Sequence, residues 1–346
     1  MRRFTSASLA LTIAVTGVAV GAVAVVAQND EVKIGMVTDV GKLEDKSFNE
    51  YTWEGAKDAA EALGAPEVAT VITEEFADYQ NNIQQLLDED FDVIITTGSL
   101  LGTDTLNAAV ANPDITFIGI DQNTATEETP NFHGVTFAEA EPGYLVGIVA
   151  ATISESGVIG AIGGANVPAV VRYKDGYYNG AKSVNPDIQV LYQEANPDPA
   201  IGFNDPERGA EIASQMMDLG ADVIFQIAAN TGVGALEAAC EAGIYGLGVD
   251  VDQAKSLPPQ AAECVVTSAE KKLREYTNAI TQSAVNGTFE GGTHLYSSAS
   301  DPVAVGISPF QEKYADLLTP ELQAALDAAV AGFIDGSIDP AAPMPE

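Results

Sequence analysis

Seven side chains that suit recognition of a polar, ring-containing molecule stand at or just beyond the ends of predicted strands. Carboxylates accept hydrogen bonds from hydroxyl groups, an Asn amide reads the edge of a base, and aromatic faces stack on a ring. Taken singly, each of these residue types is more common as a cap or turn residue, so their shared location carries the prediction. These candidate ligand-binding residues are Asp39, Phe48, Asn49, Asp121, Phe203, Asp250 and Lys271.

The sequence offers no comparable set of residues for catalysis, phosphate binding or metal binding. The stretch that starts at Gly232 opens like a dinucleotide fingerprint, but Glu237 stands where the third Gly belongs. His133 and His294 have no partner nucleophile that the sequence identifies. With only 2 Cys and 2 His, a zinc site built on these residues is disfavoured. We therefore expect a binding protein with no catalytic residues, no metal and no cofactor.

The charge of the chain limits the class of partner. The 346 residues carry 50 Asp and Glu but only 15 Lys and Arg, which gives a formal net charge of −35. Because 46% of residues are hydrophobic and only 19% are charged, there is ample material for a folded core. Nucleic acid binding needs basic phosphate contacts and is not expected. The scarcity of positive charge also disfavours a phosphorylated ligand.

The N-terminal segment resembles an export signal. Arg2 and Arg3 precede an uncharged, apolar run over residues 4–27, which a polar stretch follows. This pattern predicts a signal peptide over 1–27, or an uncleaved membrane anchor of the same extent. Either alternative places the folded part outside the cytoplasm, secreted or at the plasma membrane. In that oxidising setting Cys240 and Cys264 can form a disulfide, with two buried thiols as the alternative.

Beyond residue 31, strand-like and helix-like segments alternate, which predicts right-handed crossovers and parallel sheets covered on both faces. The expected strands are 32–38, 68–72, 91–97, 115–120, 158–163, 189–193, 223–227, 246–249, 265–267 and 303–307. The expected helices are 48–63, 79–88, 103–111, 142–154, 171–184, 206–219, 234–242, 271–284 and 320–334. The pattern restarts after about residue 140, so the fold class is α/β with two doubly wound lobes.

Capping residues mark several of the predicted helix starts. Capping boxes are expected to begin at Ser47, Thr267 and Ser308, each with Glu or Gln three residues later. A cap followed by Pro is expected at Asp205, Ser308 and Thr319. Ser47 is of further interest because it follows the loop after Asp39. In an open parallel sheet, ligands sit beyond the carboxyl ends of the strands.

Several motifs, in order along the chain, closely resemble the basic membrane protein family. These are PnrA-like substrate-binding proteins of ABC transporters, of the purine-nucleoside type. The opening motif reads Thr-Asp-Val-Gly at 38–41 and Asp-Lys-Ser-Phe-Asn at 45–49. Further matching segments are 203–206, 230–234, 248–253 and 267–271, so the resemblance spans roughly residues 32–340.

The resemblance implies a type I periplasmic-binding-protein fold, in which two lobes joined by three crossovers bind a ligand between them. It implies lobe 1 at 31–137 and 263–290, lobe 2 at 142–254 and 303–346, and crossovers at 138–141, 255–262 and 291–302. The last strand–helix units would then return to the lobes, which makes each lobe discontinuous in sequence.

The resemblance also implies a role for each candidate residue. Phe48 and Phe203 would sandwich a purine, and Asp39 and Asn49 would bond its edge. Asp121, Asp250 and Lys271 would hold ribose hydroxyls, with backbone near Gly232 assisting. The chain departs from the family at Ala228-Ala229-Asn230, where Gly is frequent, and lacks the N-terminal Cys of lipoprotein members.

We therefore expect a monomeric, non-enzymatic receptor that delivers a nucleoside-type molecule to an ABC permease and its ATPase. Three alternatives stay open: a sugar or autoinducer-like ligand, a sensing module that reports to a membrane partner, and a nucleoside-cleaving enzyme. A ligand without an aromatic ring would leave Phe48 and Phe203 unexplained, and no evident catalytic set supports the enzyme.

Overall fold

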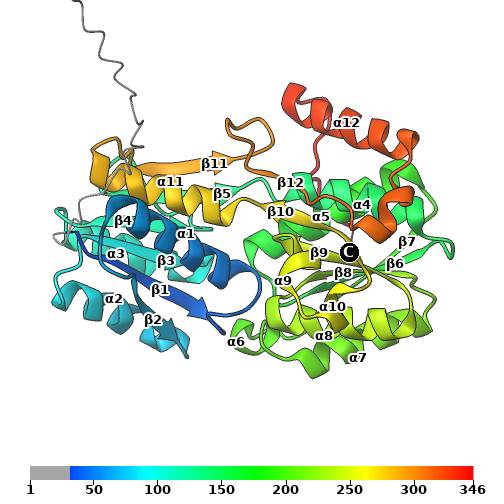
Figure 1. Ribbon diagram of the computed structural model, residues 1–346, viewed down its shortest axis with the longest axis horizontal. Helices are drawn as coiled ribbons and strands as arrows, with labels where there is room; N and C mark the ends of the chain where they lie inside the picture. Colours follow the sequence, from blue (N-terminus) through cyan, green and yellow to red (C-terminus); the bar gives the residue numbers. More distant parts are fainter. Residues whose placement is uncertain (1–31, 346) are drawn as a thin grey trace, which may run out of the picture.

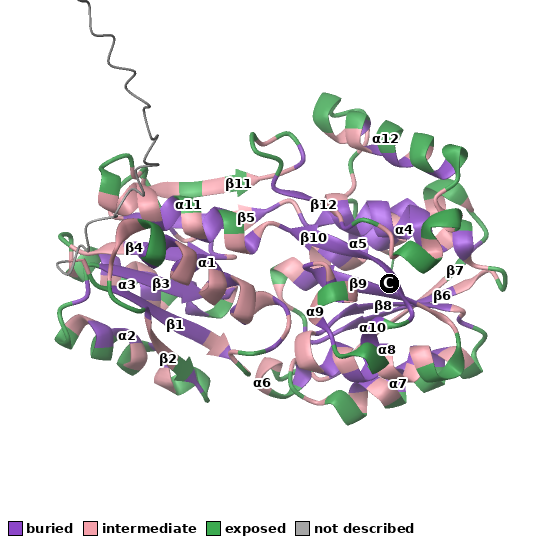
Figure 2. Ribbon diagram, viewed as in Figure 1, coloured by how far each residue is buried: buried purple, intermediate pink, exposed green. Residues whose placement is uncertain are grey.

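A computed structural model describes residues 32–345, so the predicted signal segment lies outside the described residues. The described chain forms two α/β lobes side by side, each built around a six-stranded sheet (Figure 1). This confirms the expected fold class. Buried residues concentrate in the strands of both sheets, and exposed residues follow the outer sides of the helices (Figure 2).

Lobe 1 contains the elements between residues 34 and 137 and a later return of the chain between residues 273 and 296. Its sheet has the order β11-β5-β4-β3-β1-β2, and all of its strand pairs are parallel. Its strands are β1 (Ile34–Val40), β2 (Ala69–Thr73), β3 (Val93–Thr97), β4 (Thr116–Ile120), β5 (Phe132–Phe137) and β11 (Gly292–Tyr296). Its helices are α1 (Phe48–Leu63), η1 (Phe76–Asp78), α2 (Tyr79–Asp88), η2 (Ser99–Leu101), α3 (Gly102–Ala111) and α11 (Leu273–Asn286).

Lobe 2 repeats this plan, with the sheet order β12-β10-β9-β8-β6-β7. Its strands are β6 (Val158–Gly163), β7 (Gln189–Glu194), β8 (Val223–Ile227), β9 (Tyr245–Asp250), β10 (Val265–Lys271) and the antiparallel edge strand β12 (Val305–Ile307). Its helices are α4 (Ala140–Ile153), α5 (Pro168–Val184), α6 (Pro199–Gly202), α7 (Pro206–Asp218), α8 (Ala229–Ala242), α9 (Gln253–Ser256), α10 (Pro259–Ala262), η3 (Glu312–Leu317) and α12 (Pro320–Asp335).

Three segments of the expected lobe boundaries are wrong. Strand β10 pairs with β9 and β12, so it belongs to the sheet of lobe 2, whereas 263–290 was expected in lobe 1. Strand β11 pairs with β5 in lobe 1, although 291–302 was expected to be a crossover. Helix α10 packs on α8, and α9 packs on β10, so the helices at 255–256 and 259–262 belong to lobe 2 rather than to a crossover. The chain therefore changes lobe directly after Lys271, at one edge of the ligand cleft described below.

Strands β5 and β11 were not predicted, and both lie at one edge of the sheet of lobe 1. Their sequences, FHGVTF and GTHLY, contain Gly, His and Thr in place of an apolar run. The pairing of β11 with β5 joins segments that are distant in the chain, which a local pattern does not report.

The helix starts at Asp205 and Thr319 are confirmed, since both side chains accept a backbone N–H of the first turn. The capping boxes are wrong. Thr267 and Glu270 lie within β10, and Ser308 bonds the Ser268 amide instead of starting a helix. Before α1, the cap is made by Asp45 rather than Ser47.

Helices α4 and α5 pack closely through glycines. A Cβ on Gly180 would lie 1.9 Å from the carbonyl oxygen of Tyr144, and one on Gly143 would lie 2.5 Å from that of Tyr173. No larger residue fits at these crossings without displacing backbone. The close approach fixes α5, which carries Tyr173 toward the space between the lobes.

Cys240, in α8, is joined to Cys264, just before β10, in a disulfide with a Cα–Cα distance of 4.9 Å. Of the two alternatives for this pair, the structure shows the bridge. Within residues 32–345, no helix combines the length and the apolar composition needed to cross a membrane.

Candidate ligand-binding cleft

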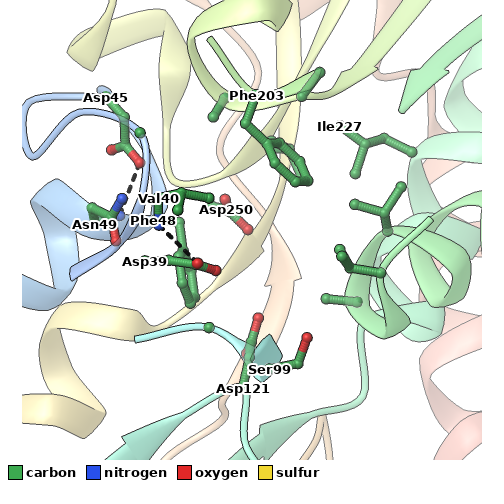
Figure 3. Close-up of a pocket in the computed structure, with 18 of the residues that line it drawn as sticks. Asp39, Val40, Asp45, Phe48, Asn49, Ser99, Asp121, Phe203, Ile227 and Asp250 are labelled. Carbon is green, nitrogen blue, oxygen red and sulfur yellow. Dashed lines mark hydrogen bonds between the residues drawn. The ribbon is translucent and has the colours of Figure 1, made fainter. Parts of the chain in front are cut away.

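The space between the lobes is a cleft of about 780 Å³, including the open volume at its mouth. Figure 3 shows the carboxylates of Asp39 and Asp121 and the ring of Phe203 pointing into this cavity from different elements. Seven of the eight residues that were expected to bind ligand line the cleft: Asp39, Phe48, Asn49, Asp121, Phe203, Asp250 and Lys271.

Lys271 occupies the centre of a buried charge cluster. Its Nζ lies 2.6 Å from Asp121 Oδ2, 3.6 Å from Glu139 Oε1 and 3.6 Å from Asp250 Oδ1. Burial alone would lower the pKa of Lys271, but these three carboxylates outweigh burial and raise the pKa above its usual value. The ammonium group therefore stays charged and holds acidic groups of both lobes together.

Asp121 and Asp250 occupy equivalent places in the two lobes, at the ends of β4 and β9. Both adopt left-handed backbone conformations, with φ of 60° and 64°. Asp250 Oδ2 accepts from Ser47 Oγ at 2.6 Å, and Oδ1 accepts from the Tyr173 hydroxyl at 3.4 Å. Burial raises the pKa of Asp121 to about 6, although Lys271 opposes this shift.

One oxygen of Asp121 is left without a partner. Asp121 Oδ1 is buried and accepts no hydrogen bond from the described residues. A buried acceptor without a partner costs free energy, and a ligand hydroxyl or N–H would remove that cost. This makes Asp121 the clearest attachment point for a hydrogen-bond donor in the cleft.

Asp39 and Asn49 contact the chain as well as the cleft. Asp39 Oδ1 accepts from the Tyr79 hydroxyl and from the Val40 amide, the latter at 2.8 Å. Burial raises the pKa of Asp39 to about 6. In the side chain of Asn49, Oδ1 accepts a hydrogen bond from Thr97 Oγ1 at 2.8 Å, and Nδ2 donates one to the Lys42 carbonyl at 3.2 Å. These bonds fix the orientation of the Asn49 amide in the cleft wall.

The rings of Phe48 and Phe203 each pack against other parts of the protein on one side. Lys271 Nζ lies 4.7 Å from the centroid of the Phe48 ring, a cation–π contact. Phe203 packs against the backbone of Gly164, where a Cβ would lie 2.2 Å from the ring. Each ring is thereby held in place while it lines the cleft.

Gly232, the eighth expected residue, is not among the residues that line the cleft. It lies in the first turn of α8, its N–H donates to the Ala228 carbonyl at 3.1 Å, and it packs on Gln226. Ala228 and Ala229 line the cleft instead, and Ala229 has a positive φ of 46°. The departure from Gly at this place thus puts two methyl groups on the cleft wall.

Sequence reasoning missed the roles of Asp45, Glu139 and Tyr173 at the cleft, and it expected Ser47 to cap a helix instead of bonding Asp250. Asp45 accepts from the amides of Ser47, Asn49 and Glu50, and burial raises its pKa to about 7. Glu139 is fully buried and pairs with Arg172 at 2.6 Å as well as with Lys271. Asp45 had a usable signal, because it precedes the expected helix start at Phe48 by three residues and can cap that helix. Tyr173 lies within the expected helix 171–184, and Glu139 lies in the expected crossover 138–141, so neither carried a signal for the cleft.

Residues 32–345 hold no cluster of three or more His, Cys, Asp and Glu side chains arranged to bind a metal ion. His133 and His294 stack at the β5–β11 edge of lobe 1, with ring centroids 4.1 Å apart. Neither is among the residues that line the cleft.

Comparison with known proteins agrees with this architecture. Residues 32–325 match the family described as "ABC transporter substrate-binding protein PnrA-like". The chain is 28% identical to the ABC transporter nucleoside-binding protein BmpA of Lactococcus lactis, over 94% of this chain and 97% of that protein. It is 33% identical to basic membrane protein A of Borreliella burgdorferi, over 75% of this chain and 74% of the relative.

Among solved structures, an ABC transporter solute-binding protein from Aeropyrum pernix superposes with a TM-score of 0.78. It is 23% identical and covers 89% of this chain and 92% of its own, which shows a shared fold. A sugar transporter from Clostridium phytofermentans has the same general fold, with a TM-score of 0.57 and 15% identity. The chain belongs to the PnrA-like family of ABC transporter substrate-binding proteins, which bind their substrates and are not enzymes.

Proposed function

We propose that this protein captures a purine nucleoside in the cleft between its lobes and delivers it to an ABC permease. The observation that carries the proposal is the combination of two aromatic rings, Phe48 and Phe203, with buried carboxylates in one cleft. An aromatic ring of the ligand would stack on the phenylalanines, and hydroxyl groups would donate to Asp121 and Asp250. The name of the Lactococcus lactis relative supports the same ligand class.

The charges that line the cleft favour an uncharged nucleoside over a nucleotide. Four carboxylates line it, from Asp39, Asp45, Asp121 and Asp250, against the two lysines Lys42 and Lys271. Lys271 is already paired with acidic side chains. A phosphate would therefore meet uncompensated negative charge, and in a buried site that repulsion is weakly screened.

Delivery to a permease follows from the family, whose members act outside the cytoplasm with a membrane permease and an ATPase. We propose that lobe closure about the segments that connect the lobes traps the ligand, as hinge motions do in binding proteins. We further propose that the protein acts as a monomer, since one chain supplies both walls of the cleft.

Native mass spectrometry of the purified protein tests the ligand class without assuming which nucleoside is bound. We expect an added mass in the nucleoside range after incubation with a mixture of inosine, guanosine, adenosine and uridine. Glucose and ribose serve as controls, because they can use the carboxylates but cannot stack as a base does. Sugar adducts without nucleoside adducts would contradict the proposal, and release of free base from inosine would indicate an enzyme.

A further inference from the structure

The loop before α1 belongs to lobe 1, but it bonds lobe 2 at two places. Ser47 Oγ donates to Asp250 Oδ2 at 2.6 Å, and Asp250 ends β9 of lobe 2. The carbonyl of the preceding residue, Lys46, accepts from Ser256 Oγ at 3.2 Å, and Ser256 ends α9. These contacts join neighbouring residues of one loop to the opposite wall of the cleft.

Ser47 is free to make this contact because it does not cap its own helix. Its side chain makes no capping hydrogen bond, although it occupies the N-cap position. Asp45 takes over this function by accepting from the amides of Ser47, Asn49 and Glu50 at 2.9, 2.9 and 3.2 Å. The hydroxyl of Ser47 is left to bond across the cleft, and the residue is fully buried there.

The loop that makes these contacts is held in an unusual conformation at Lys46. Lys46 has a positive φ of 59°, which is unfavourable for a residue with a long side chain. Its amide and its ammonium group both bond the Glu50 carboxylate, which holds the turn in place. A strained conformation that persists needs support from surrounding contacts, and the bonds to lobe 2 are part of that support.

We propose that Ser47 is a positioning residue that couples closure of the cleft to the orientation of Asp250. When the lobes close, the Ser47 hydroxyl occupies Asp250 Oδ2. Asp250 Oδ1 is left for the ligand, because its contacts to Tyr173 and Lys271 are long, at 3.4 and 3.6 Å. The role of Asp250 toward ligand rests on the proposed function; the contact between the lobes does not.

The test uses the ligand-free protein, so its outcome is independent of which ligand binds. Spin labels are placed on Asn81→Cys in α2 and Gln215→Cys in α7, both exposed, in lobes 1 and 2. Both natural cysteines are in the disulfide, so the labels react only at the introduced positions. Pulsed electron paramagnetic resonance then gives the distribution of distances between the lobes.

We expect Ser47→Ala to shift the ratio of closed to open protein at least about tenfold toward open, which corresponds to about 1.4 kcal/mol. Ser47→Thr, which keeps the hydroxyl, should restore closure. Thr52→Val is the matched control, because it removes a buried hydroxyl from α1 that bonds only within the same helix, to Phe48. In a Ser47→Ala, Asp250→Asn double variant, the ratio of closed to open protein should shift no further than in the single variant with the larger shift.

A distance distribution in Ser47→Ala that equals that of the unaltered protein would overturn the proposal. So would a Thr52→Val distribution that is as open as that of Ser47→Ala, since the effect would then reflect α1 packing. Neither result bears on nucleoside binding, which is measured separately.

Discussion

Asp121 and Asp250 end matching strands of the two lobes and reach the same ammonium group, Lys271 Nζ, at 2.6 and 3.6 Å. Each has a positive φ, so the backbone of each lobe makes the same turn at the cleft. Lys271 ends β10, after which the chain passes back to lobe 1. The charge cluster thus lies in the cleft, between the two lobes, and directly before the segment that leads the chain back to lobe 1.

Replacing Lys271 should destabilise the protein strongly. Lys271→Met leaves Asp121, Glu139 and Asp250 buried around an apolar side chain, and loss of one partner of a buried ion pair costs about 3–5 kcal/mol. Thermal unfolding at pH 7 measures the loss, which should shrink at pH 5 as carboxylates gain protons. Lys255→Met is the control, because that ion pair is on the surface, and equal losses in the two variants would contradict the account.

The stability contributed by Asp39 should depend on pH. Its pKa is about 6 in the fold, against about 3.9 in an unfolded chain. Between these values the folded state keeps a proton that the unfolded state has lost, so stability falls as the pH rises from about 4 to 7. The unfolding free energy of Asp39→Asn relative to the unaltered protein should therefore increase over this range, by on the order of 2–3 kcal/mol.

Asp58→Asn provides the control for that pH series. The hydrogen bond from Arg274 lowers the pKa of Asp58, so its contribution changes only below about pH 4. The change in unfolding free energy caused by Asp58→Asn should therefore be constant from pH 5 to 8. If the change caused by Asp39→Asn were also constant over this range, Asp39 would be ionised throughout, which contradicts a raised pKa.

Much of the strand and helix pattern could be predicted from sequence, because apolar runs such as β3 and β8 are buried on both faces. The lobe to which β10 belongs could not be predicted from the sequence, because the pairing of β10 with β9 and β12 is set by the tertiary structure. Strand-end residues such as Asp39 could be predicted as site residues from position and type. Glu139 could not, because its role depends on Arg172 and Lys271, which are distant in sequence. Gly232 was predicted as a site residue from a motif match, but it does not line the cleft.

Filling the space behind Phe203 should narrow the cleft. A Cβ on Gly164 would lie 2.2 Å from two atoms of the Phe203 ring, so Gly164→Ala forces the ring to move. The variant should bind nucleoside at least about tenfold more weakly, as measured by calorimetry. Gly306→Ala is the control, because a Cβ there meets no atom within 4 Å. Unchanged affinity in Gly164→Ala would mean that the position of Phe203 does not affect binding.

The disulfide should contribute measurably to stability. It closes a segment with a sequence separation of 24, for which the chain-entropy model gives about 3 kcal/mol. Denaturant unfolding of Cys240→Ala, Cys264→Ala should show a loss of this order, and reductant should bring the unaltered protein to the same value. If reductant also destabilises the double variant, its effect does not act through this bridge.

Titration calorimetry with inosine, guanosine, adenosine and uridine tests whether the cleft binds a nucleoside. Guanosine monophosphate, added in a parallel titration, tests the exclusion of phosphate. We expect a dissociation constant below about 1 mM for at least one purine nucleoside, much weaker binding of the nucleotide, and severe loss of affinity in Phe48→Ala. No heat of binding with any nucleoside up to that concentration would contradict this expectation.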